Sequence, residues 1–320
     1  MRILSILCIL SVLFFQSCGN PSKKSGAEKS YTVATLKGPS SMGMIRMIDS
    51  IANAGDTDIL IKIENEPIQV RKMMLDGSAD FAILPTTMAA LVYNKGMDYR
   101  LIAIPVWGTL YLFGNDTSIT SWENLRNKRV YVMARGMTPD VLFRYLLQYN
   151  GINPEKDVTL DYSFPTHIDL ANAVAAGQAT LGVISEPLAS MVISRNKSVH
   201  SLFDLNREWE NIQGSPIALT ALLVKADILK ENPQKVEQFL LDYEKSSLWV
   251  NQQPDSAAAL IVKYGILPDH EVALRAIPGS RLNFLRARDI RPQIISYLNV
   301  FYTMNPDIIG GKIPDEKFFY

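Results

Sequence analysis

The stretch that decides the fold is "TLKGPSSMGMIRMI" (residues 35–48), where an apolar strand, a short turn and a helical pattern follow one another directly. The turn carries two serines and follows a lysine. Backbone N–H groups at the start of a helix are free, and they attract anions or polar head groups. This stretch therefore suggests one wall of a ligand-binding cleft, and an ordinary capped turn is the alternative.

The same alternation of strand and helix continues outward from this stretch. Repeated βα units predict mostly parallel sheets with helices on both faces. Thr138 is expected to cap a helix whose first residue is Pro139. The expected strands are 31–36, 58–63, 79–84, 100–106, 109–115, 129–134, 158–162, 181–185 and 217–225. The expected helices are 41–55, 67–76, 86–94, 138–150 and 168–179, one opened by Glu186-Pro187, and nearly all of the chain after residue 226.

This order of elements predicts an α/β protein with two lobes. Residues 114–216 repeat the alternation of strands and helices seen in residues 31–113. Residue 217 begins a strand that is expected to return the chain to the first lobe. We therefore expect lobe 1 to contain residues 31–113 and 217–320, and lobe 2 to contain residues 114–216. The two crossovers are expected near Gly114 and Pro216.

The N-terminus, "MRILSILCILSVLFFQSCGN" (residues 1–20), has one positive charge and then an apolar run. The run is too short to span a bilayer but suits a signal peptide. Cys18 directly after it is typical of a bacterial lipoprotein, and a plain secretory signal is the alternative. We expect a signal at residues 1–18, lipid on Cys18, a flexible tether at 19–30, and a protein anchored by lipid to a bacterial membrane outside the cytoplasm.

The charge balance and the cysteine count limit which partners and cross-links are expected. The chain has 32 basic and 32 acidic residues, so its net charge gives no pull toward nucleic acid. The only cysteines are Cys8 and Cys18, and neither would remain free to form a disulfide. The fold must then rest on its own core, which a chain of this length can build.

Four strand-to-helix junctions share the character of the opening stretch. Ligands of parallel sheets bind beyond the carboxyl ends of the strands. If two lobes face each other, all four junctions point into one cleft. The junctions are Gly38-Pro39-Ser40-Ser41-Met42, Pro85-Thr86-Thr87, Arg135-Gly136-Met137-Thr138 and Glu186-Pro187.

Further side chains are candidates for the same cleft. Lys37 and Arg135 would add positive charge, although both are also typical of solvated surface. Glu186 would accept hydrogen bonds from an amine or aminopyrimidine, or else serve the helix dipole. Trp107 would stack on a ligand or pack at the hinge. Met42 and Met137 would line an apolar wall or belong to the core.

The sequence offers no catalytic machinery. The three histidines have no metal-type spacing, no mature cysteine remains as nucleophile, and no phosphate-binding glycine loop is present. "PSSMG" lacks the first glycine of a nucleophile elbow. We expect no enzyme, no cofactor and no metal.

Five segments in order resemble the solute-binding proteins of bacterial ABC importers in the nitrate/sulfonate/taurine and thiamine-pyrimidine-precursor group. They are "TLKGPSSMG", "DGSADFAILP", "NLRNKRVYV", "GMTPD" and "ISEP", and the resemblance covers residues 31–320. It implies a type II periplasmic-binding-protein fold, a membrane permease and an ATPase as partners, and ligand contacts at the four junctions named above.

The expected function is therefore capture of a small polar organic solute by a monomer. A sulfonate-like or taurine-like anion fits the helix starts with Lys37 and Arg135, and a pyrimidine-like heterocycle fits Glu186 with Trp107. Two alternatives remain open. One is a sensory module that hands its closed state to a receptor, and the other is an enzyme on the same fold that acts on a pyrimidine precursor.

Overall fold

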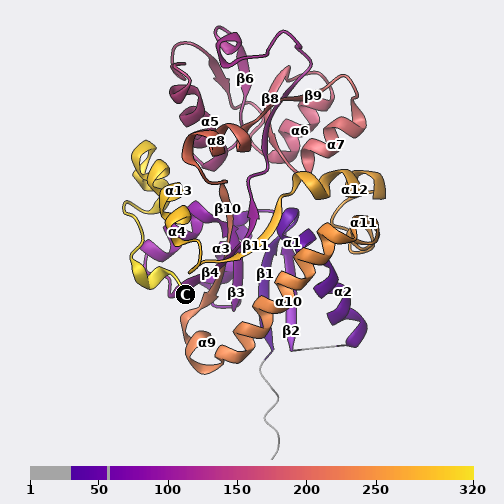
Figure 1. The fold of residues 1–320 in the computed structure, drawn as a ribbon, viewed down its shortest axis with the longest axis vertical. Helices are drawn as coiled ribbons and strands as arrows, with labels where there is room; N and C mark the ends of the chain where they lie inside the picture. The colour runs from indigo at the N-terminus through magenta and orange to yellow at the C-terminus, as the bar shows by residue number, and fades with distance from the viewer. Residues whose placement is uncertain (1–29, 56–57) are drawn as a thin grey trace, which may run out of the picture.

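The chain builds two β-sheets, one above the other along the long axis of the molecule (Figure 1). The computed structural model describes residues 30–55 and 58–320. The expected leader (residues 1–18), the lipid site at Cys18 and residues 19–29 of the tether lie outside the described residues. The first sheet has the order β11-β4-β10-β3-β1-β2. Its strands are β1 (Tyr31–Leu36), β2 (Ile59–Glu64), β3 (Phe81–Pro85), β4 (Tyr99–Trp107), β10 (Ala218–Lys225) and β11 (Leu282–Arg286).

The second sheet has the order β7-β6-β8-β5-β9. Its strands are β5 (Leu110–Gly114), β6 (Arg129–Tyr131), β7 (Thr159–Asp161), β8 (Leu181–Ser185) and β9 (His200–Asp204). We call the first sheet with its helices lobe 1 and the second sheet with its helices lobe 2. The two α/β lobes expected from the sequence are therefore present.

Helices cover both sheets. In lobe 1 they are α1 (Pro39–Gly43), α2 (Ile45–Ala54), α3 (Pro67–Leu75), α4 (Thr86–Asn94), α9 (Ala226–Glu231), α10 (Pro233–Gln252), α11 (Pro254–Lys263), α12 (His270–Gly279) and α13 (Arg291–Met304). In lobe 2 they are α5 (Thr138–Tyr149), α6 (His167–Ala175), α7 (Leu188–Arg195) and α8 (Leu205–Gln213). Short 3₁₀ helices lie at Trp122–Leu125, Pro306–Ile309 and Glu316–Phe318.

Several details differ from the sequence-based expectation, which also did not include β9 and α8. Both sheets are mixed, because β10 and β11 run antiparallel to β4, and β5 runs antiparallel to β8 and β9. β5 pairs within the second sheet, so the chain first crosses between the lobes at Gly108 and Thr109 rather than near Gly114. Strand β11 lies within the region expected to be nearly all helical.

The sheet of lobe 1 is buried on both faces. On one face, Val33, Phe81 and Ile83 pack with α2 and α10. On the other face, Ala82 and Leu84 pack with α3, α4 and α13. Alternate residues of each strand point to opposite faces, so short apolar runs such as "FAIL" supply both layers.

The two lobes share part of their core. One cluster of buried apolar side chains runs from α4 and α13 in lobe 1 to α5 and α8 in lobe 2. It includes Trp107 and Leu110 at the first crossing and Ile217 at the second. This side of the molecule is the joint between the lobes. Within the described residues, no helix is both long and apolar enough to cross a membrane.

Candidate functional site

Turns of the two lobes meet in pairs. A Cβ built on Gly38 would lie 3.5 Å from Cδ of Pro187, so the first turn of lobe 1 touches the turn after β8. The hydroxyls of Thr87 and Thr138 lie 2.8 Å apart and form a hydrogen bond between α4 and α5. The structure thus brings one residue from each of the four predicted junctions into contact across the lobes.

The first turn is held by its own residues. Gly38 has φ +135°, a conformation that side-chain-bearing residues rarely adopt. The Ser41 hydroxyl donates to the carbonyl of Gly38 at 3.0 Å and accepts from the N–H of Gly38 at 3.1 Å. The Tyr243 hydroxyl donates to the carbonyl of Ser40 at 2.9 Å. Ser41 therefore closes the turn, and α10 holds the turn in place.

The second contact corrects one expectation. Thr138 was expected to cap the helix that begins at Pro139, but α5 already includes Thr138, and Met137 stands at the capping position without a side-chain bond. The Thr138 hydroxyl bonds instead to Thr87 of the other lobe. Both threonines are buried, at 7% and 3% exposure, so this hydrogen bond is shielded from water.

Buried hydroxyls without partners gather at the same edge of the first sheet. Thr35 precedes the first turn, Thr86 begins α4, and Thr220 pairs with Pro85 in the sheet. Within the described part of the chain, the hydroxyl of each is buried and has no hydrogen-bond partner. Most buried polar groups are paired in folded proteins, so three unpaired hydroxyls beside one contact need an explanation. A polar solute between the lobes would supply one.

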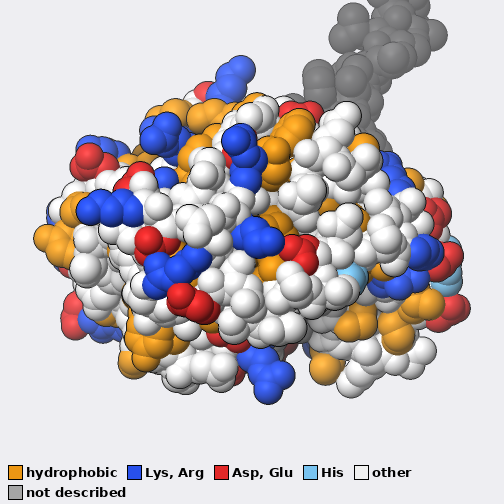
Figure 2. Space-filling model, turned by 90° about the horizontal axis from the view of Figure 1, so that it is seen from above, with side chains coloured by type: hydrophobic (Ala, Val, Ile, Leu, Met, Phe, Trp, Pro, Cys, Tyr) orange, Lys and Arg blue, Asp and Glu red, His pale blue; other side chains and the backbone are white. Residues whose placement is uncertain are grey.

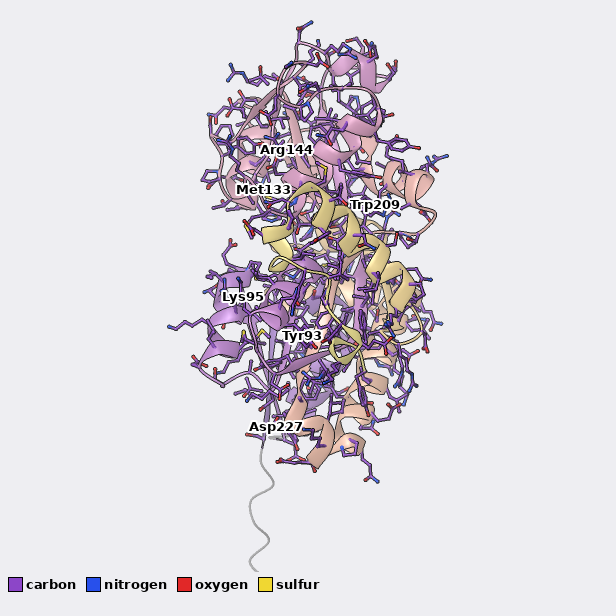
Figure 3. All side chains as sticks on the ribbon, turned by 90° about the vertical axis from the view of Figure 1, so that its left-hand side faces the viewer. Tyr93, Lys95, Met133, Arg144, Trp209 and Asp227 are labelled. Carbon is purple, nitrogen blue, oxygen red and sulfur yellow. The ribbon has the colours of Figure 1, made fainter. Side chains whose placement is uncertain are left out.

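The turn at 135–138 is fixed by a buried carboxylate. Asp140 accepts from the N–H of Gly136 at 2.7 Å, from Nε of Arg144 at 2.8 Å and from the Tyr162 hydroxyl at 2.7 Å. Arg144 also pairs with Glu155. Figure 3 places Arg144 in lobe 2, above α13. The network sets the position of the N-terminal end of α5, and with it the position of Thr138.

Five of the predicted side chains take no part in the contacts between the lobes described above. Lys37 and Met137 are exposed, and Arg135, also exposed, stacks on the ring of Tyr162 at 5.2 Å. Met42 is fully buried in the core of lobe 1. Trp107 is buried as well, and its indole N–H donates to the carbonyl of Asn283 at 2.7 Å. Both of the predicted positive charges are exposed, and the Trp107 indole N–H is already bonded.

Glu186 lies between the lobes. Its carboxylate accepts from the N–H and the hydroxyl of Ser190, each at 3.1 Å. Across the interface, a Cβ on Gly279 would lie 2.7 Å from Oε1 of Glu186. Burial raises the pKa of Glu186 to about 7, while Ser190 and the more distant Arg275 lower it.

The open surface hollows lie away from these turns. One of about 580 Å³ is lined by Arg144, Gln148, Asn153 and Met304 among others, and one of about 490 Å³ is lined by Tyr145, Tyr149, Ser296 and Met304 among others. None of the predicted site residues lines either hollow. Thr87 and Thr138 touch directly, so a solute placed between these two hydroxyls would separate them. No cluster of three metal-ligating side chains occurs among residues 30–55 and 58–320.

Sequence reasoning missed several residues of this region. Asp140 is not among the predicted site residues, although the structure shows that it binds the N–H of Gly136 in the turn before α5. Tyr297 on α13 reaches the site from near the end of the chain. The side chain of Tyr297 is 1% exposed. Burial raises the pKa of Tyr297 well above its ordinary value, and the adjacent Thr138 opposes this rise only in part. Nothing in the pattern of α13 distinguishes Tyr297 from an ordinary core residue.

Known proteins resemble this chain over most of its length. A structure of an ABC transporter protein from Parabacteroides distasonis has a TM-score of 0.79 at 24% identity, covering 91% of this chain and 99% of that one. The periplasmic aliphatic sulphonate binding protein SsuA from Escherichia coli has a TM-score of 0.73 at 15% identity, covering 91% and 92%. These likenesses confirm the periplasmic-binding-protein fold.

A curated relative matches a smaller part. YtlA of Bacillus subtilis (strain 168) is 24% identical over 181 residues, which are 55% of this chain and 52% of that protein. The chain thus spans about half the length of this curated relative.

The family model for the periplasmic substrate-binding protein of phosphonate ABC transporters matches residues 42–266, well over half of the chain. Proteins of this family are transporter components rather than enzymes. They act outside the cytoplasm, where they bind a small molecule and serve a permease and its ATPase. The expectation of a substrate-binding protein of an ABC transporter is therefore confirmed, and the chain belongs to the family of periplasmic substrate-binding proteins of phosphonate ABC transporters.

Proposed function

We propose that this protein captures a small polar organic solute between its lobes and delivers it to an ABC permease. The observation that carries the proposal is the hydrogen bond between Thr87 and Thr138, which joins the helix starts of the two lobes. A solute that contacts both helix starts would favour the closed arrangement over an open one. The permease would then receive the closed, loaded form.

The chemistry at the contact favours an oxyanion head group, such as a phosphonate or sulfonate. The N-terminal ends of α4 and α5 meet there, and each offers free backbone N–H groups. Thr86 adds a buried, unpaired hydroxyl within the described chain. Since Lys37 and Arg135 are exposed, helix ends and hydroxyls rather than cations would hold the charge.

A pyrimidine-like heterocycle is the second solute class, and it would use Glu186. The carboxylate of Glu186 lies between the lobes, where it can accept hydrogen bonds from amino groups. The two solute classes require opposite charge states of Glu186. An oxyanion would be repelled by an ionised Glu186, whereas an aminopyrimidine would be attracted by it.

Calorimetry on protein freed of bound solute tests the proposal. Alkylphosphonates and alkylsulfonates form one titration set, and aminopyrimidines form the other. We expect one set to bind, and we expect Thr87→Val and Thr138→Val each to weaken binding about 10- to 100-fold, because hydrogen bonds to charged groups contribute about 1.5–3 kcal/mol. Thr159→Val, an exposed threonine of lobe 2, is the matched control.

Two results would count against capture at this site. One is that no member of either set binds the solute-free protein. The other is that Thr87→Val and Thr138→Val bind a solute as tightly as Thr159→Val does.

The proposal includes anchoring by lipid on Cys18, with the folded lobes acting as a monomer. The support for the anchor is the apolar leader that ends at Ser17-Cys18. Expression with a radiolabelled fatty acid should label the parent protein and leave Cys18→Ser unlabelled. Equal labelling of both proteins would exclude Cys18 as the attachment site.

A further inference from the structure

The end of α12 forms a third contact between the lobes, on the side of the molecule away from the shared core. Gly279 is the last residue of α12, in lobe 1, and Glu186 follows β8, in lobe 2. A methyl group at Gly279 would lie 2.7 Å from Oε1 and 2.9 Å from Cγ of Glu186. Glycine is therefore the residue that lets the carboxyl of Glu186 lie flat against the backbone of the other lobe.

Other groups around this contact are polar or charged. From β5, the Tyr111 hydroxyl donates to the carbonyl of Gly279 at 3.4 Å. Beside it, Arg281 of lobe 1 pairs with Asp204 of lobe 2. Arg275, on α12, is the cation whose charge acts on Glu186.

On the lobe 2 side, α7 contributes the N–H and hydroxyl of Ser190 to the carboxylate. His167 of α6 bonds to the hydroxyl of Ser185, the residue before Glu186. From lobe 1, Gly38 packs on the adjacent Pro187. The charge of Arg275 thus competes with two unfavourable features, which are the loss of water on burial and the negative, C-terminal end of the α12 dipole.

We propose that Glu186 couples lobe closure to proton uptake, so that closing the lobes moves its carboxyl from water onto the end of α12 and binds one proton from solvent. The inference rests on the proposed function only in requiring that the lobes open. It assigns no solute. It makes the closed arrangement more favourable in mildly acidic surroundings.

The direction and size of the pH effect on lobe closure follow from the difference in the pKa of Glu186 between the open and closed forms. In an open form, Glu186 would face water with a pKa no higher than the ordinary 4.5, because Ser190 of the same lobe lowers it, whereas in the closed form burial raises that pKa to about 7. The closed form then binds more protons between these two values, so closure strengthens as pH falls. Between pH 8.5 and pH 5.5, the ratio of closed to open molecules should rise roughly 30-fold.

The distance between the lobes in solute-free protein measures this directly. Spin labels would be placed by Lys72→Cys in lobe 1 and Lys197→Cys in lobe 2, both exposed, in a full-length background with Cys8→Ser and Cys18→Ser. Electron paramagnetic resonance would record the distance distribution at several pH values. We expect the short-distance population to grow about 30-fold relative to the long one from pH 8.5 to pH 5.5.

Three variants make the test specific. Glu186→Gln cannot ionise, so its distribution should stay closed and independent of pH. Gly279→Ala pushes the Glu186 side chain away from α12, so it should favour the open form at every pH. Glu210→Gln removes an exposed carboxyl of lobe 2 and should behave as the parent does.

The inference is overturned if the parent distribution does not change with pH, or if Glu186→Gln shows the same change as the parent. Both outcomes are independent of solute binding, so they leave the capture function to be judged by calorimetry. Conversely, a protein that binds no tested solute can still show the pH-dependent closure.

Discussion

Replacing Asp140 by alanine should destabilise lobe 2 and loosen the turn that carries Thr138. Asp140 is 2% exposed and accepts hydrogen bonds from Gly136, Arg144 and Tyr162. Its removal leaves the guanidinium of Arg144, which is 16% exposed, with Glu155 as its remaining carboxylate partner. Breaking a buried ion pair by deleting one partner costs about 3–5 kcal/mol.

Because Glu155 is retained and is largely exposed, we expect the lower part of that range, about 3 kcal/mol. Urea unfolding followed by circular dichroism measures the loss. Asp116→Ala is the matched control, because Asp116 also pairs with a cation, Lys128, in lobe 2 but at the surface. Its loss should be much smaller, since exposed ion pairs contribute little.

The reasoning is refuted if Asp140→Ala unfolds at the same urea concentration as Asp116→Ala. Binding offers a second readout. If Asp140 positions the start of α5, Asp140→Ala should also weaken solute binding under conditions where the variant remains folded. A variant that is destabilised but binds normally would show that the network supports the lobe without positioning the site.

Three further predictions concern single contacts. Tyr243→Phe removes the hydroxyl that bonds to the carbonyl of Ser40 and should cost about 1 kcal/mol of unfolding free energy, whereas Tyr302→Phe, at an exposed tyrosine, should cost little; equal losses in urea unfolding would contradict this. Gly38→Ala forces a methyl group onto a backbone with φ +135° and should cost about 1–3 kcal/mol, so an unchanged melting curve would exclude that strain. Hydrogen bonds, first from Ser118, lower the pKa of Asp116 from 3.8 to about 2. The contribution of Asp116 to stability is therefore present above pH 3.8 and lost as pH falls through 2. In Asp116→Asn the urea midpoint should vary less with pH over that range than in the parent, and an equal variation in both proteins would contradict the assignment.

The two-lobed architecture follows from local patterns in the sequence. Short apolar runs closed by Gly or Pro, such as "ADFAILP", predict strands and helix starts because each pattern acts within a few residues. What these patterns do not contain is the direction of pairing. β10 is recognisable as a strand, but its antiparallel pairing with β3 joins residues more than 130 positions apart. β11 is not predicted, because it has only five residues, lies at the edge of the sheet and is surrounded in the sequence by helical patterns.

The candidate site shows the same division. The helix starts at Thr86 and Thr138 are predictable, since Pro, Thr and Gly mark them. Their hydrogen-bond partners are not, because Thr87 meets Thr138 from a different lobe, and Trp107 bonds to Asn283 near the other end of the chain. The contacts of charged side chains are not predictable either, because the guanidinium of Arg135 lies over the ring of Tyr162, which is 27 residues further along the chain.

The face of the molecule above lobe 2 carries no patch of a single charge. Viewed from above lobe 2, acidic, basic and apolar side chains are interspersed over the face (Figure 2). This agrees with the absence of net charge in the sequence.

The central claim is that a solute binds where the helix starts of α4 and α5 meet. A crystal structure of protein purified with its native solute tests that claim most directly. We predict density for the solute between residues 85–87 and residues 135–138, with the hydroxyls of Thr87 and Thr138 drawn apart beyond their present 2.8 Å. A solute bound in the hollows beside α5 and α13, with Thr87 and Thr138 still bonded to each other, would contradict it.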